Sequence, residues 1–233
     1  MKAFGQRLTY TVFTVFFLLT FTVISSWSAP TSLKNKRSST SGTAKVDGFR
    51  SAKFGMSQDM VLKAIYKDFK ITKSKVKIET HPIDRTENYL IKVQDLIPES
   101  GIAQIAYLFG YKTKKLFQVN VLWRNNGDVQ KNAKGLITTA NLLRSLFLKK
   151  GFAKDKAIAN HPLKDGSIIV FRGKDNLGRM VLLFLNNPVG TPEKAKLKSA
   201  TERAELTKKM TLMLSYMERP EKPDVFKISK DDF

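Results

Sequence analysis

The sequence predicts an α+β protein, in which two tandem units of one helix and several antiparallel strands form a layered helix-on-sheet domain after an N-terminal signal segment. Three observations lead to this prediction. The chain of 233 residues opens with an apolar stretch that contains no acidic residue. Two helix-like patterns begin near residues 57 and 138. Each pattern is followed by short runs rich in Val, Ile, Tyr and Phe, which turn residues separate from one another.

Residues 1–28 have the pattern of a secretory signal peptide. Lys2 and Arg7 precede an apolar stretch that spans residues 8–24, and small residues follow it. An uncleaved anchor formed by residues 8–27 is the alternative, because the stretch approaches the roughly 20 residues that cross a bilayer. We therefore expect a periplasmic or secreted protein, or one that this segment anchors in the membrane. The candidate cleavage site consists of Ser28 and Ala29.

Residues 29–45 are rich in Ser, Thr, Lys and Gly and lack apolar periodicity, so we expect a disordered basic linker there. The chain has no cysteine, which excludes a lipidated cysteine, disulfides and thiolate metal sites. Its formal net charge of +21 predicts attraction to polyanions. The alternative is a surface that is merely solvated by lysine.

The first α+β unit is expected to span residues 46–124. Residues 49–54 look like a short strand, and Ser57 is a suitable N-cap for the helix that follows. Strands are expected at residues 75–80, 89–96, 101–109 and 116–123, with a hairpin over residues 107–117. The apolar face of the helix is expected to comprise Met60, Val61, Ala64, Ile65 and Phe69.

The second unit is expected to span residues 125–233. After a polar loop at residues 124–135, Thr138 or Thr139 is a suitable cap for a helix that ends at two lysines and Gly151. Strands follow at residues 167–172, 179–186 and 210–217, and an exposed helix is expected near residues 192–209. The apolar residues of the first of these two helices are Leu142, Leu143, Leu146 and Phe147.

The two units repeat the same order of features at a period near 80 residues, which predicts an internal duplication. Each helix is followed by a His-Pro pair, namely His81-Pro82 and His161-Pro162, and then by the strands. The alternative is a chance likeness between two short α+β segments.

A helix followed by antiparallel strands, given twice, resembles the topology of two groups. These are the β-lactamase-inhibitor-protein-like group and the small outer-membrane-assembly lipoproteins. The start Phe54-Gly55-Met56-Ser57, with Val61 a few residues on, is similar to the helix entry of these groups. The resemblance implies a binding or assembly factor rather than an enzyme. The chain departs from both groups because it has neither a lipid-accepting cysteine nor paired cysteines, so no binding site is carried over.

The sequence contains no recognisable catalytic motif. The two histidines, His81 and His161, both precede proline, which favours extended or turn backbone, and neither has the spacing of a metal-ligand pair. No GxSxG, Walker-type or GxGxxG pattern occurs. We therefore expect no enzyme activity, no cofactor and no metal site. A local patch of acids, which we interpret as solvated loop carboxylates, consists of Asp84, Glu87, Asp95 and Glu99.

Basic residues are concentrated in one stretch of the chain. Residues 100–160 carry eleven Lys and Arg against two Asp, a net charge of +9. The hairpin tip, the loop after Trp123 and the end of the second helix could combine into a cationic face for an anionic partner. The alternative is basic charge dispersed over the surface. The candidate binding residues are Lys112, Lys114, Lys115, Arg124, Lys149 and Lys150.

Two classes of function follow from these patterns. The first is an exported, envelope-facing binding or assembly protein that uses a basic surface and a sheet face to hold a protein or an anionic envelope component, including peripheral contact with a membrane. The second is a nucleic-acid-binding protein, which the charge favours and the export signal contradicts. A hydrolase of unrecognised type is the third alternative, and no residue pattern supports it.

Overall fold

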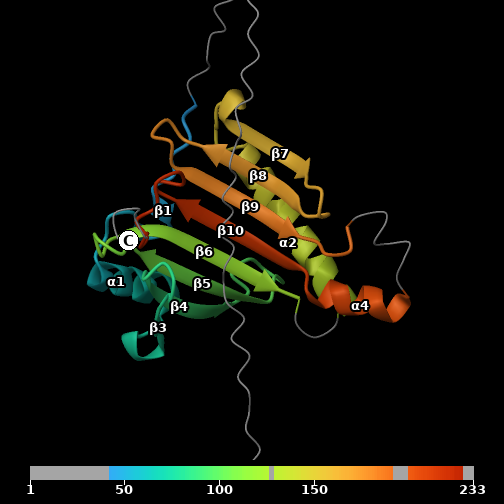
Figure 1. The fold of residues 1–233 in the computed structure, drawn as a ribbon, viewed down its shortest axis with the longest axis horizontal. Coiled ribbons are helices and arrows are strands. Elements are labelled where there is room, and N and C mark those ends of the chain that lie inside the picture. Colours follow the sequence, from blue (N-terminus) through green and yellow to red (C-terminus); the bar gives the residue numbers. More distant parts are fainter. Residues whose placement is uncertain (1–41, 126–128, 191–198, 228–233) are drawn as a thin grey trace, which may run out of the picture. The chain divides into compact units, whose positions relative to one another are not determined.

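An eight-stranded antiparallel sheet forms the centre of the protein and joins both of the predicted units (Figure 1). The computed structural model describes residues 42–125, 129–190 and 199–227, so the expected signal segment, with Ser28 and Ala29, lies outside the described residues. The strand order is β3-β4-β5-β6-β10-β9-β8-β7. The strands are β3 Lys77–Thr80, β4 Glu87–Gln94, β5 Ile102–Phe109, β6 Leu116–Arg124, β7 Ala157–Pro162, β8 Ile168–Lys174, β9 Met180–Asn186 and β10 Thr211–Met217.

Both halves of the sheet are built from the same order of elements. A helix and a short 3-10 turn precede β3 to β6, and another helix and 3-10 turn precede β7 to β10, with a further helix before β10. The last strands of the two halves, β6 and β10, pair in the middle of the sheet. The fold is therefore mixed α+β, as predicted. The helical elements are α1 Gln58–Phe69, η1 Lys73–Lys75, α2 Val129–Leu148, η2 Lys154–Lys156 and α4 Ala200–Lys208.

The hydrophobic core lies between the helices and one face of the sheet. Alternate strand residues point to opposite faces, so each strand gives every second side chain to this core. Trp123, Tyr107 and Phe171 are among the largest fully buried side chains, and α1 and α2 both contribute to the same cluster. In Figure 1, α2 lies behind the sheet, and no described helix lies in front of it. The front of the sheet is called the open face below.

The first predicted helix is confirmed in its start and in most of its buried face. Ser57 occupies the N-cap position of α1, although its side chain makes no capping hydrogen bond. Val61, Ala64 and Ile65 are buried, whereas Met60, which was expected on the same face, is exposed. The helix spacing of the buried residues accounts for the packing of α1 on the core.

The predicted start of the second helix is wrong. α2 begins at Val129, within the stretch expected to be a polar loop, and Thr139 is a buried residue in its middle rather than a cap. The predicted end is confirmed, because the helix stops at Leu148 and Gly151 follows with a φ of 77°.

The apolar face expected for the second helix is half correct. Leu143 and Phe147 are buried, but Leu142 and Leu146 are exposed. The core-facing side of α2 recurs at helical spacing and consists of Leu136, Ala140, Leu143 and Phe147.

Two strand predictions also need correction. The strand expected at residues 49–54 is a tight hairpin of β1 Gly48–Phe49 and β2 Ala52–Lys53, with Arg50 at a φ of 51° in its turn. The sequence analysis missed β7, which contains His161, a residue for which extended or turn backbone was expected. The hairpin expected at residues 107–117 is confirmed, since β5 and β6 pair directly across it.

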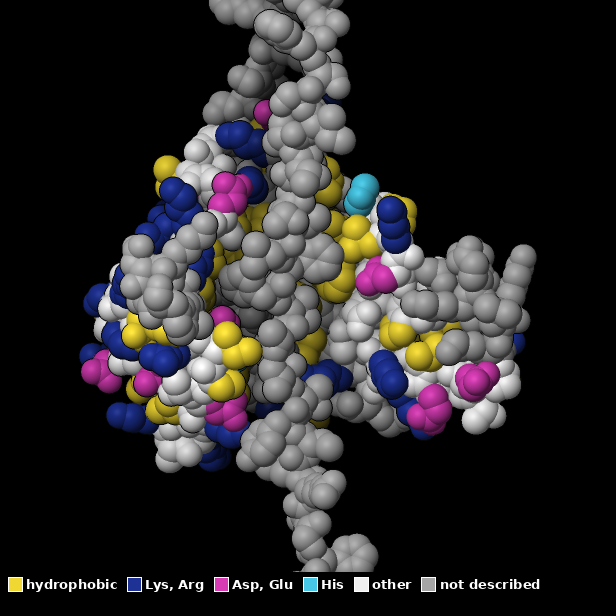
Figure 2. All heavy atoms as spheres, in the orientation of Figure 1, with side chains coloured by type: hydrophobic (Ala, Val, Ile, Leu, Met, Phe, Trp, Pro, Cys, Tyr) yellow, Lys and Arg dark blue, Asp and Glu magenta, His cyan; other side chains and the backbone are white. Residues whose placement is uncertain are grey.

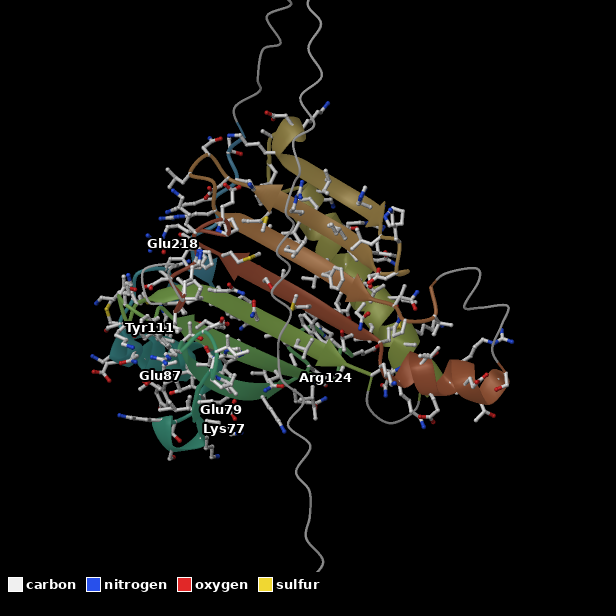
Figure 3. The ribbon with its side chains drawn as sticks, in the orientation of Figure 1. Lys77, Glu79, Glu87, Tyr111, Arg124 and Glu218 are labelled. Atoms are coloured by element: carbon white, nitrogen blue, oxygen red, sulfur yellow. The ribbon has the colours of Figure 1, made fainter. Side chains whose placement is uncertain are left out.

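The two edge strands of the sheet are each short or irregular. All four residues of β3 are exposed, and Lys77 forms an ion pair with Glu79 along it (Figure 3). On the other edge, β7 contains Asn160 at a φ of 54° and ends at Pro162. Neither edge therefore offers a long, regular row of backbone groups.

α4 has no buried residue and begins with a capping box between Ser199 and Glu202, so the exposed helix expected near residues 192–209 is found in its described portion. Within the described ranges, no helix has both the length and the apolar character needed to cross a membrane.

Candidate functional site

The six basic residues proposed from the sequence do not gather at one place. Lys112, Lys114 and Lys115 lie in the turn between β5 and β6, whereas Arg124 ends β6. At about 3.3 Å per residue, the strand separates Arg124 from that turn by about 26 Å. Figure 3 shows Tyr111, in the turn, and Arg124 at opposite ends of the sheet. The remaining two residues, Lys149 and Lys150, directly follow α2.

The β5–β6 turn does bind an anion, and this anion belongs to the chain itself. The carboxylate of Asp224 accepts hydrogen bonds from the backbone N–H of Lys112 at 3.0 Å and of Thr113 at 2.9 Å. It also accepts one from the Thr113 hydroxyl at 2.6 Å. A Cβ atom at Gly110 would lie 2.1 Å from Asp224 Oδ2, so the glycine leaves room for the carboxylate. Asp224 therefore occupies the backbone donors of the turn, while the side chains of its three lysines form no ion pair with it.

The segment around Asp224 is held by further contacts. The Phe226 ring packs edge-on against Tyr111, with ring centroids 5.4 Å apart. The Arg85 guanidinium lies 4.0 Å from the centre of the Phe226 ring. The Phe226 N–H donates to the Asp84 carbonyl at 2.8 Å. Partial burial alone would raise the pKa of Asp224, but hydrogen bonds from Thr113 and Lys112 more than offset it, and the pKa lies below its ordinary value. We call residues 224–226 the C-terminal clamp.

The two histidines lie far from each other. His81 follows β3 and His161 belongs to β7, and these two strands are the opposite edges of the sheet. His81 Nδ1 accepts a hydrogen bond from the Asp84 N–H at 3.1 Å and lies 3.3 Å from the Asp84 carboxylate, while its Nε2 is buried without a hydrogen-bond partner. Among the described residues, no group of three or more His, Asp or Glu side chains is arranged to hold a metal ion.

The four acids of the expected acidic patch are divided between the two ends of β4. Asp84 and Glu87 lie at its start, where Glu87 accepts a hydrogen bond from Gln58. Asp95 and Glu99 follow its end, and Asp95 accepts from the Gly101 N–H at 2.9 Å. Asp95 and Glu99 are exposed in a loop, as expected of solvated carboxylates, whereas Asp84 and Glu87 are half-buried and Glu87 belongs to β4.

The open face of the sheet is a candidate binding surface whose residues the sequence did not identify. Strand pairing places side chains of neighbouring strands side by side in rows across this face. One row runs from Gln104 through Leu122, Met213 and Phe184 to Ile169. The next row runs through Ala106, Asn120, Ser215 and Leu182, and a third through Leu108, Gln118, Met217 and Met180.

The centre of the open face carries no charged side chain. In these three rows the strands β5, β6, β10 and β9 contribute only apolar, amide and hydroxyl groups, although 26% of the chain is charged. Each row meets one cation at one flank only: Lys92 lies opposite Gln104 on β4, and Arg172 and Lys174 lie opposite Leu182 and Met180 on β8. The other ends of the rows are the uncharged residues Ile169, Leu90 and Asn88. Figure 2 shows hydrophobic side chains near the middle of this view, while Lys and Arg side chains gather along its left margin, on the side of α1 in Figure 1. The centre of the face is thus uncharged, with Lys92 on one side of it and Arg172 on the other.

Most residues of these rows are half-buried by their neighbours in the sheet, and none of the twelve central ones is fully exposed. Three of the twelve are methionines, whose unbranched side chains adapt to different surfaces. Alternation along β9, with Met180, Leu182 and Phe184 between core residues, was the sequence signal for a second apolar surface.

The chain was compared with protein-family models, with curated proteins and with solved structures, and none of the three comparisons gives a match.

Proposed function

We propose that this chain is an exported, non-enzymatic binding or assembly protein that holds a protein partner on the open face of its sheet. The observation that carries the proposal is the charge-free centre of that face, bounded by Lys92 and Arg172. Depletion of charge at the centre and polar groups at the rim are typical of protein interfaces. A partner with an apolar contact surface and acidic groups around it would complement this face.

The arrangement also favours affinity without a deep cavity. Binding would remove water from Leu182, Phe184 and Met213, which are only half-buried in the free protein. The neighbouring amides of Gln104 and Asn120 can donate to and accept from a partner's backbone or side chains. Because the paired strands already fix the backbone of these residues, binding would order only their side chains.

We further propose that the two halves of the sheet arose by duplication and that the topology resembles the binding and assembly groups named above. The order of helix, 3-10 turn and strands in both halves supports this proposal, as does the central pairing of β6 with β10. In such an arrangement the open face is built by both halves together. Its central rows therefore combine β5 and β6 with β10 and β9.

Nucleic acid fits the open face less well than a protein does. Single-strand binding sheets place cations beside stacking aromatics along the path of the backbone. The central rows on β5, β6, β10 and β9 offer no Lys or Arg to a phosphate chain. The flanking Lys92 and Arg172 would instead steer an acidic protein toward the neutral centre.

Site-specific photo-crosslinking tests the proposal. A crosslinking residue is placed at Met213 on the open face and, as the matched control, at Leu142, an exposed apolar position on the opposite side in α2. We expect one defined adduct in cell envelopes from position 213 and none of the same mass from position 142. Equal adducts from both positions, or none from position 213, would contradict the proposal.

Once the partner has been identified, Phe184→Asp should weaken its binding by about thirtyfold or more, as expected for a buried aromatic anchor at an interface centre. Leu142→Asp should leave the affinity unchanged. Cell fractionation with a C-terminal tag and N-terminal sequencing of the recovered protein test the export part of the proposal separately, since cytoplasmic recovery with an intact leader would overturn it.

A further inference from the structure

A cavity of about 190 Å³ opens between α2 and the strands β8 and β9, on the side of the sheet away from the open face. Its floor is apolar and deeply buried, and it is formed by Ala140, Val170, Leu185 and Met210. An apolar cavity of about 150 Å³ is large enough to hold a benzene molecule. This cavity therefore has room for one small ring or one short acyl chain.

The mouth of the cavity is polar. It is lined by Asn141, Arg144, Asn160 and Asn187. Arg144 Nη1 donates a hydrogen bond to Asn160 Oδ1 at 2.7 Å, and no carboxylate of the described residues lies within 4.0 Å of the guanidinium. The remaining guanidinium N–H groups form a fixed fork that matches the geometry of a carboxylate.

The backbone around this mouth is irregular in two strands at once. β8 carries a bulge between Ile169 and Phe171, which brings Val170 into the cavity wall. In the facing strand β7, Asn160 adopts a φ of 54°, a left-handed conformation that is unusual for a residue other than glycine. Bulges and left-handed residues of this kind re-aim side chains beside binding sites. Here they coincide with the contact between Asn160 and Arg144.

We propose that this cavity binds a small monocarboxylate, with its apolar body on the buried floor and its carboxylate on Arg144. Asn141 and Asn187 supply amide groups at the same mouth. The chemistry combines an apolar interior with a few polar groups at one end, which is the usual composition of a small-molecule site. The site is independent of the open face, so a partner on the sheet and a ligand in the cavity can be bound together.

The test is a titration of the full chain with hexanoate and with benzoate, followed by backbone amide shifts in NMR spectra. The uncharged analogues hexanamide and benzamide have the same shape and serve as matched ligands. We expect saturable shifts confined to residues around α2, β8 and β9, and affinity for the carboxylates about tenfold above that for the amides, the effect of one charge-assisted bidentate contact.

Two variants make the test specific. Arg144→Gln should lower the affinity for the carboxylates to that for the amides, whereas Lys67→Gln, which removes one exposed charge on α1, should leave it unchanged. Ile137→Trp enlarges a half-exposed residue at the mouth of the cavity. It should lower the affinity for all four ligands without disturbing the core. Equal binding of acids and amides to the unaltered chain would overturn the proposal, as would shifts elsewhere or no shifts.

Discussion

Replacing Asp224 with alanine should release the C-terminal clamp from the sheet. The change removes the acceptor of three hydrogen bonds, two from the backbone of the β5–β6 turn and one from the Thr113 hydroxyl. No described carboxylate other than that of Asp224 accepts a hydrogen bond from the N–H groups of Lys112 and Thr113. In the variant, water would have to accept the hydrogen bonds that the Asp224 carboxylate accepts in the unaltered chain.

The loss of stability in Asp224→Ala can be estimated because the contact between Asp224 and the turn resembles a helix N-cap. A carboxylate that accepts from free backbone N–H groups at a partly exposed site contributes about 0.5–2 kcal/mol. The clamp adds the hydroxyl bond and the ring contact of Phe226 with Tyr111, so we expect a loss near the upper end, about 1.5 kcal/mol. For a urea m-value of about 2 kcal/mol per molar, the unfolding midpoint should fall by about 0.7 M.

Urea unfolding followed by circular dichroism measures this loss, and amide hydrogen exchange at Lys112 and Thr113 shows whether it is local. Glu221→Ala is the matched control, because it removes an equally charged side chain three residues away that contacts only the exposed amine of Lys174. An unchanged midpoint and unchanged exchange for Asp224→Ala would refute the reasoning. An equal loss for Glu221→Ala would refute it as well.

The contact between Asp224 and the β5–β6 turn also predicts that the free energy of unfolding depends on pH. The folded pKa of Asp224 lies below its ordinary value of 3.8, so its carboxylate contributes stability at neutral pH, where it is ionised in both the folded and the unfolded chain. This contribution should decline as the pH falls through the ordinary value toward the folded pKa. The difference in stability between the unaltered chain and Asp224→Asn should therefore narrow in strong acid, and a constant difference down to that range would contradict the assignment.

Three further predictions concern the core, a helix end and the basic turn. Ile65→Asp should abolish cooperative unfolding, because Ile65 is fully buried and an unpaired carboxylate there would cost several kcal/mol; a normal melt would contradict the assigned face of α1. Lys70→Gly should raise the free energy of unfolding by about 0.5–1 kcal/mol, because Lys70 ends α1 at a φ of 58°, and a lower melting temperature would argue against this. Replacing Lys112, Lys114 and Lys115 together with glutamine should weaken retention on an anionic matrix and flatten its dependence on salt, whereas unchanged elution would show that the turn does not contribute to anion binding.

The elements that the sequence predicted well are those in which local pattern and tertiary packing agree. The β5–β6 hairpin combines alternating apolar residues with a Gly110 turn, and α1 combines Ser57 with a helical stripe of buried residues. The start of α2 was missed because Asn132 and Gly135 are poor helix formers, and the packing of Leu136 against the core outweighs that preference. β7 was missed because Ala, Asn and Pro are uncommon in strands, and this edge strand gains its order from pairing with β8.

The candidate site depends on contacts between residues that are distant in the sequence, and local patterns do not predict such contacts. Lys115 and Arg124 are close in sequence, but an extended strand places them at opposite ends of the sheet. Asp224, which binds the basic turn, lies more than a hundred residues from it in the sequence, and no local sequence pattern predicts this contact. Alternation predicts that a strand has two different faces, whereas only the packing of the helices determines which face stays open.

The short or irregular edge strands of the sheet affect how copies of the protein can associate. Eight strands in one sheet would otherwise present two templates to which further copies could add indefinitely. The charged, four-residue β3 and the kinked β7 with its terminal proline stop such growth at each side. The edges of the sheet therefore disfavour self-association by strand addition.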